Sequence, residues 1–229
     1  MATLLVRLQG PLQSWGTTSR FDERDTQLEP SKSGVLGLVC AALGRDRAEP
    51  VSDLGGLRMG VRVDREGVPM RDYQTARGVA LATGKSDAGR TVVSERFYIS
   101  DAIFLVGLEG DDTTLAAVQD AIRAPHWPIC LGRKSFVPSM PVYLTGGLVD
   151  SSLIDALTRW PLLDEQVRYE GDEPITRRFV IEHDNEGAVR LDDVVAPFSE
   201  RQFGPRFVQT HNLTLVDEGV VDVSDTFDA

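Results

Sequence analysis

The stretch Arg7–Gly44 reads RLQGPLQSWGTTSRFDERDTQLEPSKSGVLGLVCAALG and joins an apolar strand to an apolar helix through 23 mostly polar residues. A connection of this length in a compact domain is usually functional or disordered, because a plain link needs only a handful of residues. It ends in Ser31-Lys32-Ser33-Gly34, where free backbone N–H groups at a helix start favour an anion. The connection also carries the cations Arg20, Arg24 and Lys32 and the aromatic Trp15. This chemistry suits a chain of phosphates and bases better than a small metabolite.

Hydrophobic periodicity outward from this stretch predicts an α+β fold. Leu4, Val6 and Leu8 alternate with other residues as in a half-buried strand, whereas the segment before Gly44 is apolar nearly all round, as in a buried helix. The expected elements are strands at Ala2–Gln9, Leu57–Val63, Tyr98–Leu108 and Pro141–Leu144, and helices at Ser33–Leu43 and Thr113–Arg123. Their order is β-α-β-β-α-β, which is the ferredoxin-like, RRM-like arrangement.

An arm is expected between the second and third strands, and further strands after the last. Residues 74–96 hold three glycines and few large apolar groups, so this segment cannot build a core of its own and is a flexible loop or an arm that orders on a partner. Near the C-terminus, a helix is expected at Ser151–Trp160, and Phe179–Glu182 and Ala188–Leu191 predict a hairpin. We predict one domain over residues 1–229 with this arm inserted.

Composition excludes several classes of protein. The longest apolar run, Val35–Leu43, is much shorter than the ~20 residues of a membrane span, and the N-terminus has no secretory signal pattern. Cys40 and Cys130 stand in apolar surroundings without CxxC spacing, which is typical of reduced thiols in the cytoplasm. We therefore expect a cytoplasmic protein without a membrane partner.

The net charge of −11 looks unsuited to a nucleic-acid partner, but the charge is unevenly distributed. Residues 1–100 carry 14 basic and 12 acidic side chains, whereas residues 101–229 carry 10 basic and 23 acidic ones. Phosphate binding needs a local basic groove and not a basic total. An acidic proteome explains the same total without any reference to partners.

Several motifs have both a structural and a functional interpretation. Trp15 is either a core aromatic or a stacking platform. The serines before the helix cap it, and Lys32 with the free N–H groups is a candidate phosphate site. Arg96 either forms an ion pair with Glu95 or Asp101 or contacts a base or a phosphate. The loop Leu131-Gly132-Arg133-Lys134-Ser135 can bring backbone donors and cations close to phosphates.

The sequence predicts no catalysis, no metal and no cofactor. Gly78–Ser86 imitates a P-loop, but five residues instead of four separate Gly78 from Gly84, and no apolar helix follows. Acid–base chemistry needs paired proton donors and acceptors. The three histidines, His126, His183 and His211, have no partner at a useful spacing.

The sequence resembles the CasD family of type I-E CRISPR Cascade subunits, in the RAMP superfamily. A specific block of residues carries the resemblance: Arg7-Leu8, Gly10-Pro11, Gln13, Trp15-Gly16, Thr26, Pro30, Ser31-Lys32-Ser33-Gly34, Leu36-Gly37-Leu38, Ala41-Ala42-Leu43-Gly44 and Arg47. Weaker matches are Arg71-Asp72-Tyr73, Arg96–Ala102, Leu131–Ser135 and Arg201-Gln202-Phe203.

The resemblance implies a RAMP fold and a non-catalytic RNA-binding subunit that holds the 5′ handle of the crRNA in antiviral defence. Its implied partners are the crRNA, the backbone and large subunits of Cascade, and target DNA through the assembled complex. Residues 74–96 would form a thumb along the guide RNA that reaches the backbone subunit. The expected RNA-binding residues are Gln13, Trp15, Arg20, Arg24, Thr26, Lys32, Ser33, Arg71, Tyr73, Arg96, Gly132, Arg133, Lys134 and Ser135.

Two alternatives remain open at this point. The first is a RAMP metal-independent endoribonuclease that processes pre-crRNA, for which Tyr73, Lys134 and His126 are the candidates to test. The second is a standalone ferredoxin-like domain that binds a small molecule.

Overall fold

The computed structural model describes residues 2–17, 23–80, 84, 89–164 and 175–215 as a mixed α+β chain with mostly antiparallel sheets. Arg20, expected to bind RNA, lies outside the described residues. The helices are α1 Lys32–Leu43, α2 Ser52–Gly55, α3 Asp112–Arg123 and α4 Leu153–Arg159. No helix among the described residues is long and apolar enough to cross a membrane.

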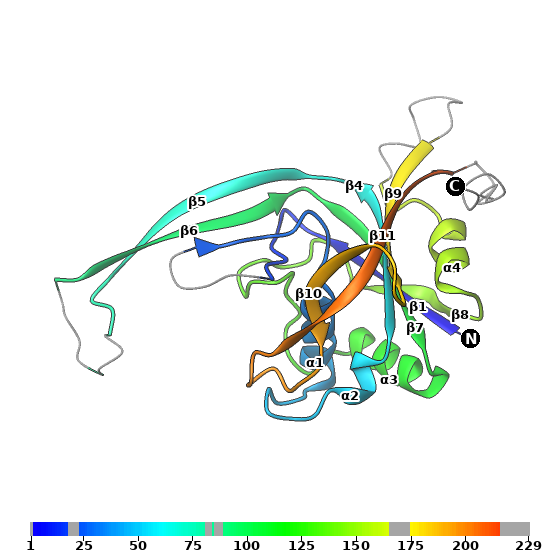
Figure 1. Cartoon of the computed structure of the whole chain (residues 1–229), viewed down its shortest axis with the longest axis horizontal. Coiled ribbons are helices and arrows are strands. Elements are labelled where there is room, and N and C mark those ends of the chain that lie inside the picture. The colour runs from blue at the N-terminus through cyan, green and yellow to red at the C-terminus, as the bar shows by residue number, and fades with distance from the viewer. Residues whose placement is uncertain (1, 18–22, 81–83, 85–88, 165–174, 216–229) are drawn as a thin grey trace.

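A seven-stranded sheet forms the body of the molecule (Figure 1). Its strands are β1 Ala2–Gln9, β4 Arg58–Arg65, β7 Ile103–Gly110, β8 Tyr143–Val149, β9 Ile175–His183, β10 Ala188–Val194 and β11 Phe203–Leu215. Their order across the sheet is β10-β11-β9-β4-β7-β1-β8, and every neighbouring pair is antiparallel.

The central strands are apolar on both faces, because helices cover both. In β1, Leu4, Val6 and Leu8 join the core that includes α1 and α3, whereas Leu5 joins a second core under α4. β7 divides in the same way, with Leu105 on the α4 side. β7 is thus buried on both faces, and so is the first part of β1, so the prediction of a half-buried strand there is wrong.

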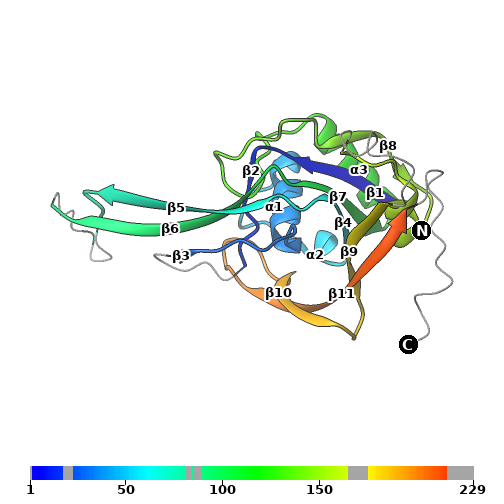
Figure 2. The ribbon, with the colours of Figure 1, turned by 90° about the horizontal axis from the view of Figure 1, so that it is seen from above.

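α1 is enclosed by the sheet (Figure 2). The sheet curls so that β10 packs against α1 on the side away from β1. The side chain of Ser31 caps the helix start, and Gly44, at a φ of 75°, ends the helix in the left-handed conformation that favours glycine. The predicted buried helix is confirmed.

A long hairpin extends away from this body (Figures 1 and 2). It consists of β5 Val68–Arg77 and β6 Thr91–Ser100, so it starts earlier and ends later than the predicted arm at residues 74–96. Two short strands, β2 Leu12–Gln13 and β3 Glu23–Arg24, also pair with β6. The predicted single strand Tyr98–Leu108 is wrong, because Asp101, at a φ of 57°, separates β6 from β7.

The predicted hairpin between Phe179–Glu182 and Ala188–Leu191 is also wrong. Both segments are strands, β9 and β10, but β11 lies between them and pairs with each. Residues Asp184-Asn185-Glu186-Gly187 are typical of a turn and do bend the chain. The two strands that they connect are nevertheless not neighbours in the sheet. The expected additional C-terminal strands are present.

Candidate nucleic-acid interface

Three arginines from separate segments meet where the β5–β6 hairpin leaves the body. β3 runs parallel to β6 and places Arg24 opposite Arg96. Arg133, from the loop after α3, donates to the carbonyl oxygens of Arg24 (3.2 Å) and Phe97 (2.8 Å). These contacts join the two strands to the loop, and we call Arg24, Arg96 and Arg133 the thumb-base arginines.

The thumb-base arginines repel one another. The pKa of Arg133 lies below its ordinary value, mainly because the guanidinium is partly buried, and further because Arg96 and Arg24 are close; Asp72 and Asp25 offset this only in part. Among the described residues, no carboxylate lies within ion-pair distance of these three guanidinium groups. In contrast, nine described arginines do have such a partner: Arg45, Arg58, Arg62, Arg65, Arg71, Arg159, Arg178, Arg190 and Arg206. An anionic ligand would relieve the repulsion at the thumb base.

The loop Leu131–Ser135, which we call the glycine-rich loop, is fixed by close contacts. Gly132 has a φ of 90°, and a Cβ there would come within 1.8 Å of the carbonyl oxygen of Ser14, so only glycine fits. The Arg133 guanidinium lies 5.5 Å from the centre of the Phe136 ring, which in turn packs against Tyr98. Lys134 and Ser135 are exposed on the same loop. The loop therefore holds its polar groups at fixed positions, and their contact with phosphates stays a prediction.

A hollow of about 360 Å³ opens beside the thumb-base arginines. It lies between the glycine-rich loop, the start of α1 and the segment before β11. The residues that line it are Ser14, Trp15, Gly16, Arg24, Asp25, Ser31, Ser33, Gly34, Arg47, Gly132, Arg133, Phe198 and Phe203. Two of the thumb-base arginines thus belong to the wall of a concave site.

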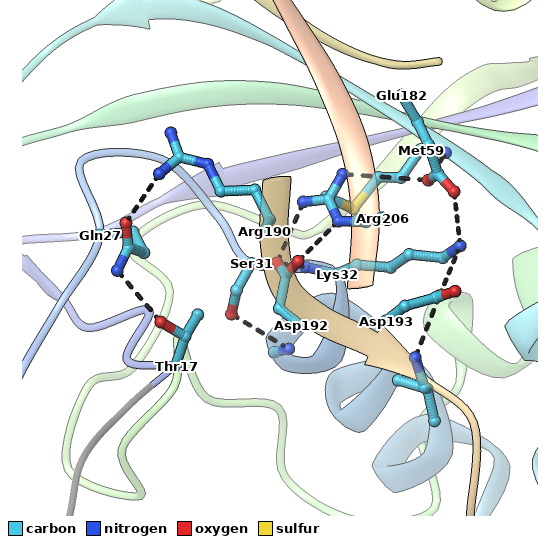
Figure 3. Close-up of polar contacts among 12 residues, drawn as sticks. Thr17, Gln27, Ser31, Lys32, Met59, Glu182, Arg190, Asp192, Asp193 and Arg206 are labelled. Atoms are coloured by element: carbon cyan, nitrogen blue, oxygen red, sulfur yellow. Dashed lines mark hydrogen bonds and ion pairs between the residues drawn. The ribbon is translucent and has the colours of Figure 1, made fainter. Parts of the chain in front are cut away.

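Lys32 does not belong to this surface, and its predicted role in binding phosphate is wrong. Its side chain is 2% exposed, and its Nζ lies 2.9 Å from both Glu182 and Asp193 (Figure 3). Glu182 comes from β9 and Asp193 from β10. Because two carboxylates already neutralise this buried ammonium group, Lys32 fastens α1 to the C-terminal strands.

Most of the backbone donors at the start of α1 are also engaged. The N–H of Lys32 donates to Asp192 (2.8 Å), which also accepts two hydrogen bonds from Arg206 (Figure 3). Ser31 accepts from Gly34 and Val35. Within the part of the chain that the structure describes, the N–H of Ser33 has no hydrogen-bond partner. The helix start thus offers one free donor at the hollow instead of the expected set.

Trp15 and Gln13 are buried, so their predicted direct contacts with RNA are wrong, whereas Thr26 is only partly buried and its predicted contact stays a prediction. Trp15 is 1% exposed, and its indole N–H donates to Gln13 Oε1 (3.2 Å). Gln13 is fully buried and donates to the carbonyl oxygen of Ala102 (2.8 Å). The Thr26 hydroxyl accepts from the Trp15 backbone N–H and donates to the carbonyl of Gln27. Their hydrogen bonds hold the connection between β1 and α1 in its conformation, whereas the sequence predicted that this connection presents them to RNA.

Arg71 and Tyr73 lie on the opposite face of the hairpin from Arg96. Asp72 is the residue paired with Arg96, and side chains alternate between the faces of a strand. Arg71 forms an ion pair with Glu95, and Tyr73 is 62% exposed. The ion pair with Glu95 or Asp101, which was one of the two alternatives for Arg96, is absent from the described residues; its guanidinium donates to the Ser94 hydroxyl instead.

The three candidates for endoribonuclease chemistry come from separate places. His126 lies at the C-terminal end of α1, where its N–H donates to the carbonyl of Ala42 and its ring covers Gly44. A 12-residue helix is about 18 Å long, which separates His126 from the hollow at the helix start. Tyr73 is on the hairpin and Lys134 on the glycine-rich loop. The described residues hold no cluster of three metal-ligating side chains.

The residues of the hollow that sequence reasoning did not select include Arg47, Phe198 and Phe203. Arg47 donates to the carbonyl oxygen of Phe198 (3.0 Å), and the rings of Phe198 and Phe203 lie 6.4 Å apart, centre to centre. Arg47 and Phe203 do belong to segments that carry the family resemblance, which is the one signal that pointed to them. Phe198 gave none.

Comparisons with known proteins agree with this resemblance. The family model described as CRISPR-associated protein (Cas_Cas5) matches residues 3–209. The Escherichia coli K12 protein "CRISPR system Cascade subunit CasD" is 31% identical over 155 residues, which cover 62% of this chain and 69% of the relative.

Two solved structures have similar folds. One, described as a Cas protein, is 48% identical with a TM-score of 0.76, over 95% of this chain and 97% of the other. A chain of a CRISPR RNA-guided surveillance complex is 32% identical with a TM-score of 0.80, over 93% of this chain and 90% of the other.

Proposed function

The chain belongs to the CRISPR-associated protein (Cas_Cas5) family, and from this premise we propose that it is a non-catalytic subunit of a type I-E Cascade surveillance complex that holds the 5′ handle of the crRNA. The observation that carries the proposal is the convergence of Arg24, Arg96 and Arg133, for which the described residues provide no carboxylate partner. Arginine suits both bidentate phosphate contact and stacking on unpaired bases.

The path of the RNA follows from these positions. The strand would pass along the Arg96 face of the hairpin, cross the glycine-rich loop and end at the hollow. The RNA-binding residues proposed on this path are Arg24, Ser33, Arg96, Gly132, Arg133, Lys134 and Ser135. Arg71 and Tyr73, on the opposite face, would contact the guide where the hairpin meets the neighbouring backbone subunit.

The order of the strands supports a RAMP architecture within one domain. The central strands β4-β7-β1-β8 with the crossover helices α1 and α3 have the β-α-β-β-α-β order of the ferredoxin-like arrangement. In this interpretation the β5–β6 hairpin is an insertion between the second and third strands, and β9, β11 and β10 extend one edge.

The partners follow from the relatives. The CasD relative is a Cascade subunit, and one structural neighbour comes from an RNA-guided surveillance complex. We extend to this chain a place among other subunits, including the backbone and large subunits, and contact with target DNA through the assembled complex. Base pairing by the guide would then select the DNA, while this chain binds RNA shape and backbone. The separation of His126 from the hollow supports a non-catalytic role.

Salt dependence tests the proposed groove. We expect the binding constant of the purified chain for single-stranded handle RNA to fall as the salt concentration rises. On a plot of log binding constant against log salt concentration, each phosphate contact should contribute a slope of about −0.7. Arg96→Gln should weaken binding and make this slope shallower by about 0.7. Arg159→Gln is the matched control, since Arg159 is exposed on α4 at the far side of the sheet. A flat salt dependence of the wild-type chain contradicts the groove.

A cleavage assay separates this proposal from the endoribonuclease alternative. We expect intact RNA after the purified chain is incubated with repeat RNA without metal ions. Cleavage at a defined position that is lost in Tyr73→Phe or Lys134→Met would overturn the non-catalytic role.

A further inference from the structure

We propose that the hollow beside the thumb base holds one unstacked nucleobase of the bound RNA, against a wall made by Phe198 and Phe203. This inference rests on the proposed function, because it specifies which part of the RNA the site takes. The hollow is distinct from the phosphate-binding face of the hairpin, since neither Arg96 nor any residue of β5 lines it.

The size of the hollow suits a single base. Its volume of about 360 Å³ lies near the lower limit of the roughly 300–1,000 Å³ that small-molecule sites span. A space near this limit holds one base more readily than a run of several bases. Proteins generally bind single-stranded RNA through bases that have left the stack, so we assign the hollow to a single unstacked base.

The wall of the hollow includes two aromatic rings, one packed on the core and one partly exposed. The rings of Phe198 and Phe203 are 6.4 Å apart and tilted by 56°. Phe203 begins β11 and is 37% exposed, although large aromatic side chains are usually buried. Phe198 rests on α1 at Gly37, where its ring lies 3.8 Å from the position of a Cβ. This contact fixes one ring and leaves the other accessible.

Arg47 is positioned beside the aromatic pair. One of its guanidinium nitrogens donates to the carbonyl of Phe198, and the N–H of Ser199 donates to the carbonyl of Arg47. The first hydrogen bond holds the exposed guanidinium beside Phe198 at the hollow, where its plane can cover a base, and the second ties the Arg47 backbone to the same segment. No carboxylate among the described residues pairs with it.

The hollow also has polar lining residues that suit the rest of the nucleotide. Arg24 and Arg133 are among them, and within the described residues the N–H of Ser33 is the unused backbone donor at the helix start. Trp15 fills the space beneath Gly34, where a Cβ would come within 2.8 Å of the indole. The base would lie against the phenylalanines and its phosphate against the arginines.

Abasic scanning tests the inference. Handle RNAs with a single abasic residue at each position in turn are titrated into the purified chain. We expect one position to lose about five- to tenfold in affinity, the lower part of the range for stacking on an aromatic side chain, since Phe203 is partly solvent-exposed. Phe203→Ala should lower the affinity for intact RNA by the same factor. In this variant, the abasic residue at that position should cause no further loss of affinity. Phe203→Tyr should bind as the wild type does.

The controls keep the two proposals apart. Val195→Ala alters an exposed apolar residue that does not line the hollow, and it should leave every affinity unchanged. RNA binding with equal affinities across the abasic series overturns the nucleobase site and leaves the proposed function standing. The same holds if the abasic penalty persists in Phe203→Ala. Absence of RNA binding by the wild-type chain overturns both proposals.

Discussion

Replacing Lys32 by Met should destabilise the protein without changing how the folded protein binds RNA. The substitution keeps the length of the side chain but leaves Glu182 and Asp193 without their cation. Removing one partner of a buried ion pair typically costs about 3–5 kcal/mol. Glu182 is 14% and Asp193 25% exposed, and Glu182 also accepts the N–H of Met59. Water and this hydrogen bond reduce the cost, so we expect a loss of about 2–4 kcal/mol in the free energy of unfolding.

Urea denaturation of the variant and of a matched control measures this loss. The control is Lys134→Met, which changes an exposed lysine and should alter the free energy of unfolding by less than about 0.5 kcal/mol. A double-mutant cycle of Lys32→Met with Glu182→Gln should show coupling of about 1–3 kcal/mol. RNA affinity, measured where Lys32→Met remains folded, should match the wild type. Wild-type stability combined with a tenfold or greater loss of RNA affinity would refute the structural role.

Three further outcomes follow from the same geometry. Gly132→Ala should weaken RNA binding and lower the melting temperature, because its Cβ meets the carbonyl of Ser14; a wild-type melting curve contradicts this. Arg133→Gln should lower RNA affinity and reduce the salt slope by about 0.7, as a salt titration will show. Burial raises the pKa of the Cys40 thiol to about 11 and also raises that of Cys130. Since the thiolate is the nucleophile, alkylation of the native protein at pH 8, followed by mass spectrometry, should leave Cys40 unmodified.

The sequence was sufficient to predict the central elements of the fold. The hydrophobic pattern of each central element indicates the type of element that forms, and tertiary packing does not change that type. These elements are β1, β4, β7, α1 and α3. The run from Tyr98 to Leu108 shows the limit of this reasoning. An apolar run indicates burial, but it does not show that the backbone changes direction at Asp101 and feeds two different sheets.

The C-terminal strands were predicted individually, but their partners were not. A turn signal at residues 184–187 is local information, and it favours pairing of the two strands that it connects. The actual partner of both is β11, whose pairing with β9 joins residues such as Ile175 and Leu215 that are far apart in the chain. Pairing at this sequence separation leaves no local pattern, so periodicity cannot identify it.

The same limit explains the errors at the site. Lys32, Trp15 and Gln13 have side chains suited to RNA, and the residues next to them in sequence give no sign of burial. What buries Lys32 is a pair of carboxylates about 150 residues away in the chain. Arg133 and Arg96 do lie together at the thumb base, and among the described residues neither meets a carboxylate that would occupy it.

The distribution of carboxylates also reconciles a net charge of −11 with a basic groove. Acidic residues of the second half, such as Glu182 and Asp192, point inward and neutralise Lys32 and Arg206 beneath the surface. They therefore add to the negative total without weakening the field at the thumb base. The thumb-base arginines have no carboxylate within ion-pair distance among the described residues. The positive potential that they create together would attract an RNA phosphate. Affinity for RNA should therefore respond to changes in these three residues and stay insensitive to exposed acidic residues more than a Debye length, about 8 Å, away.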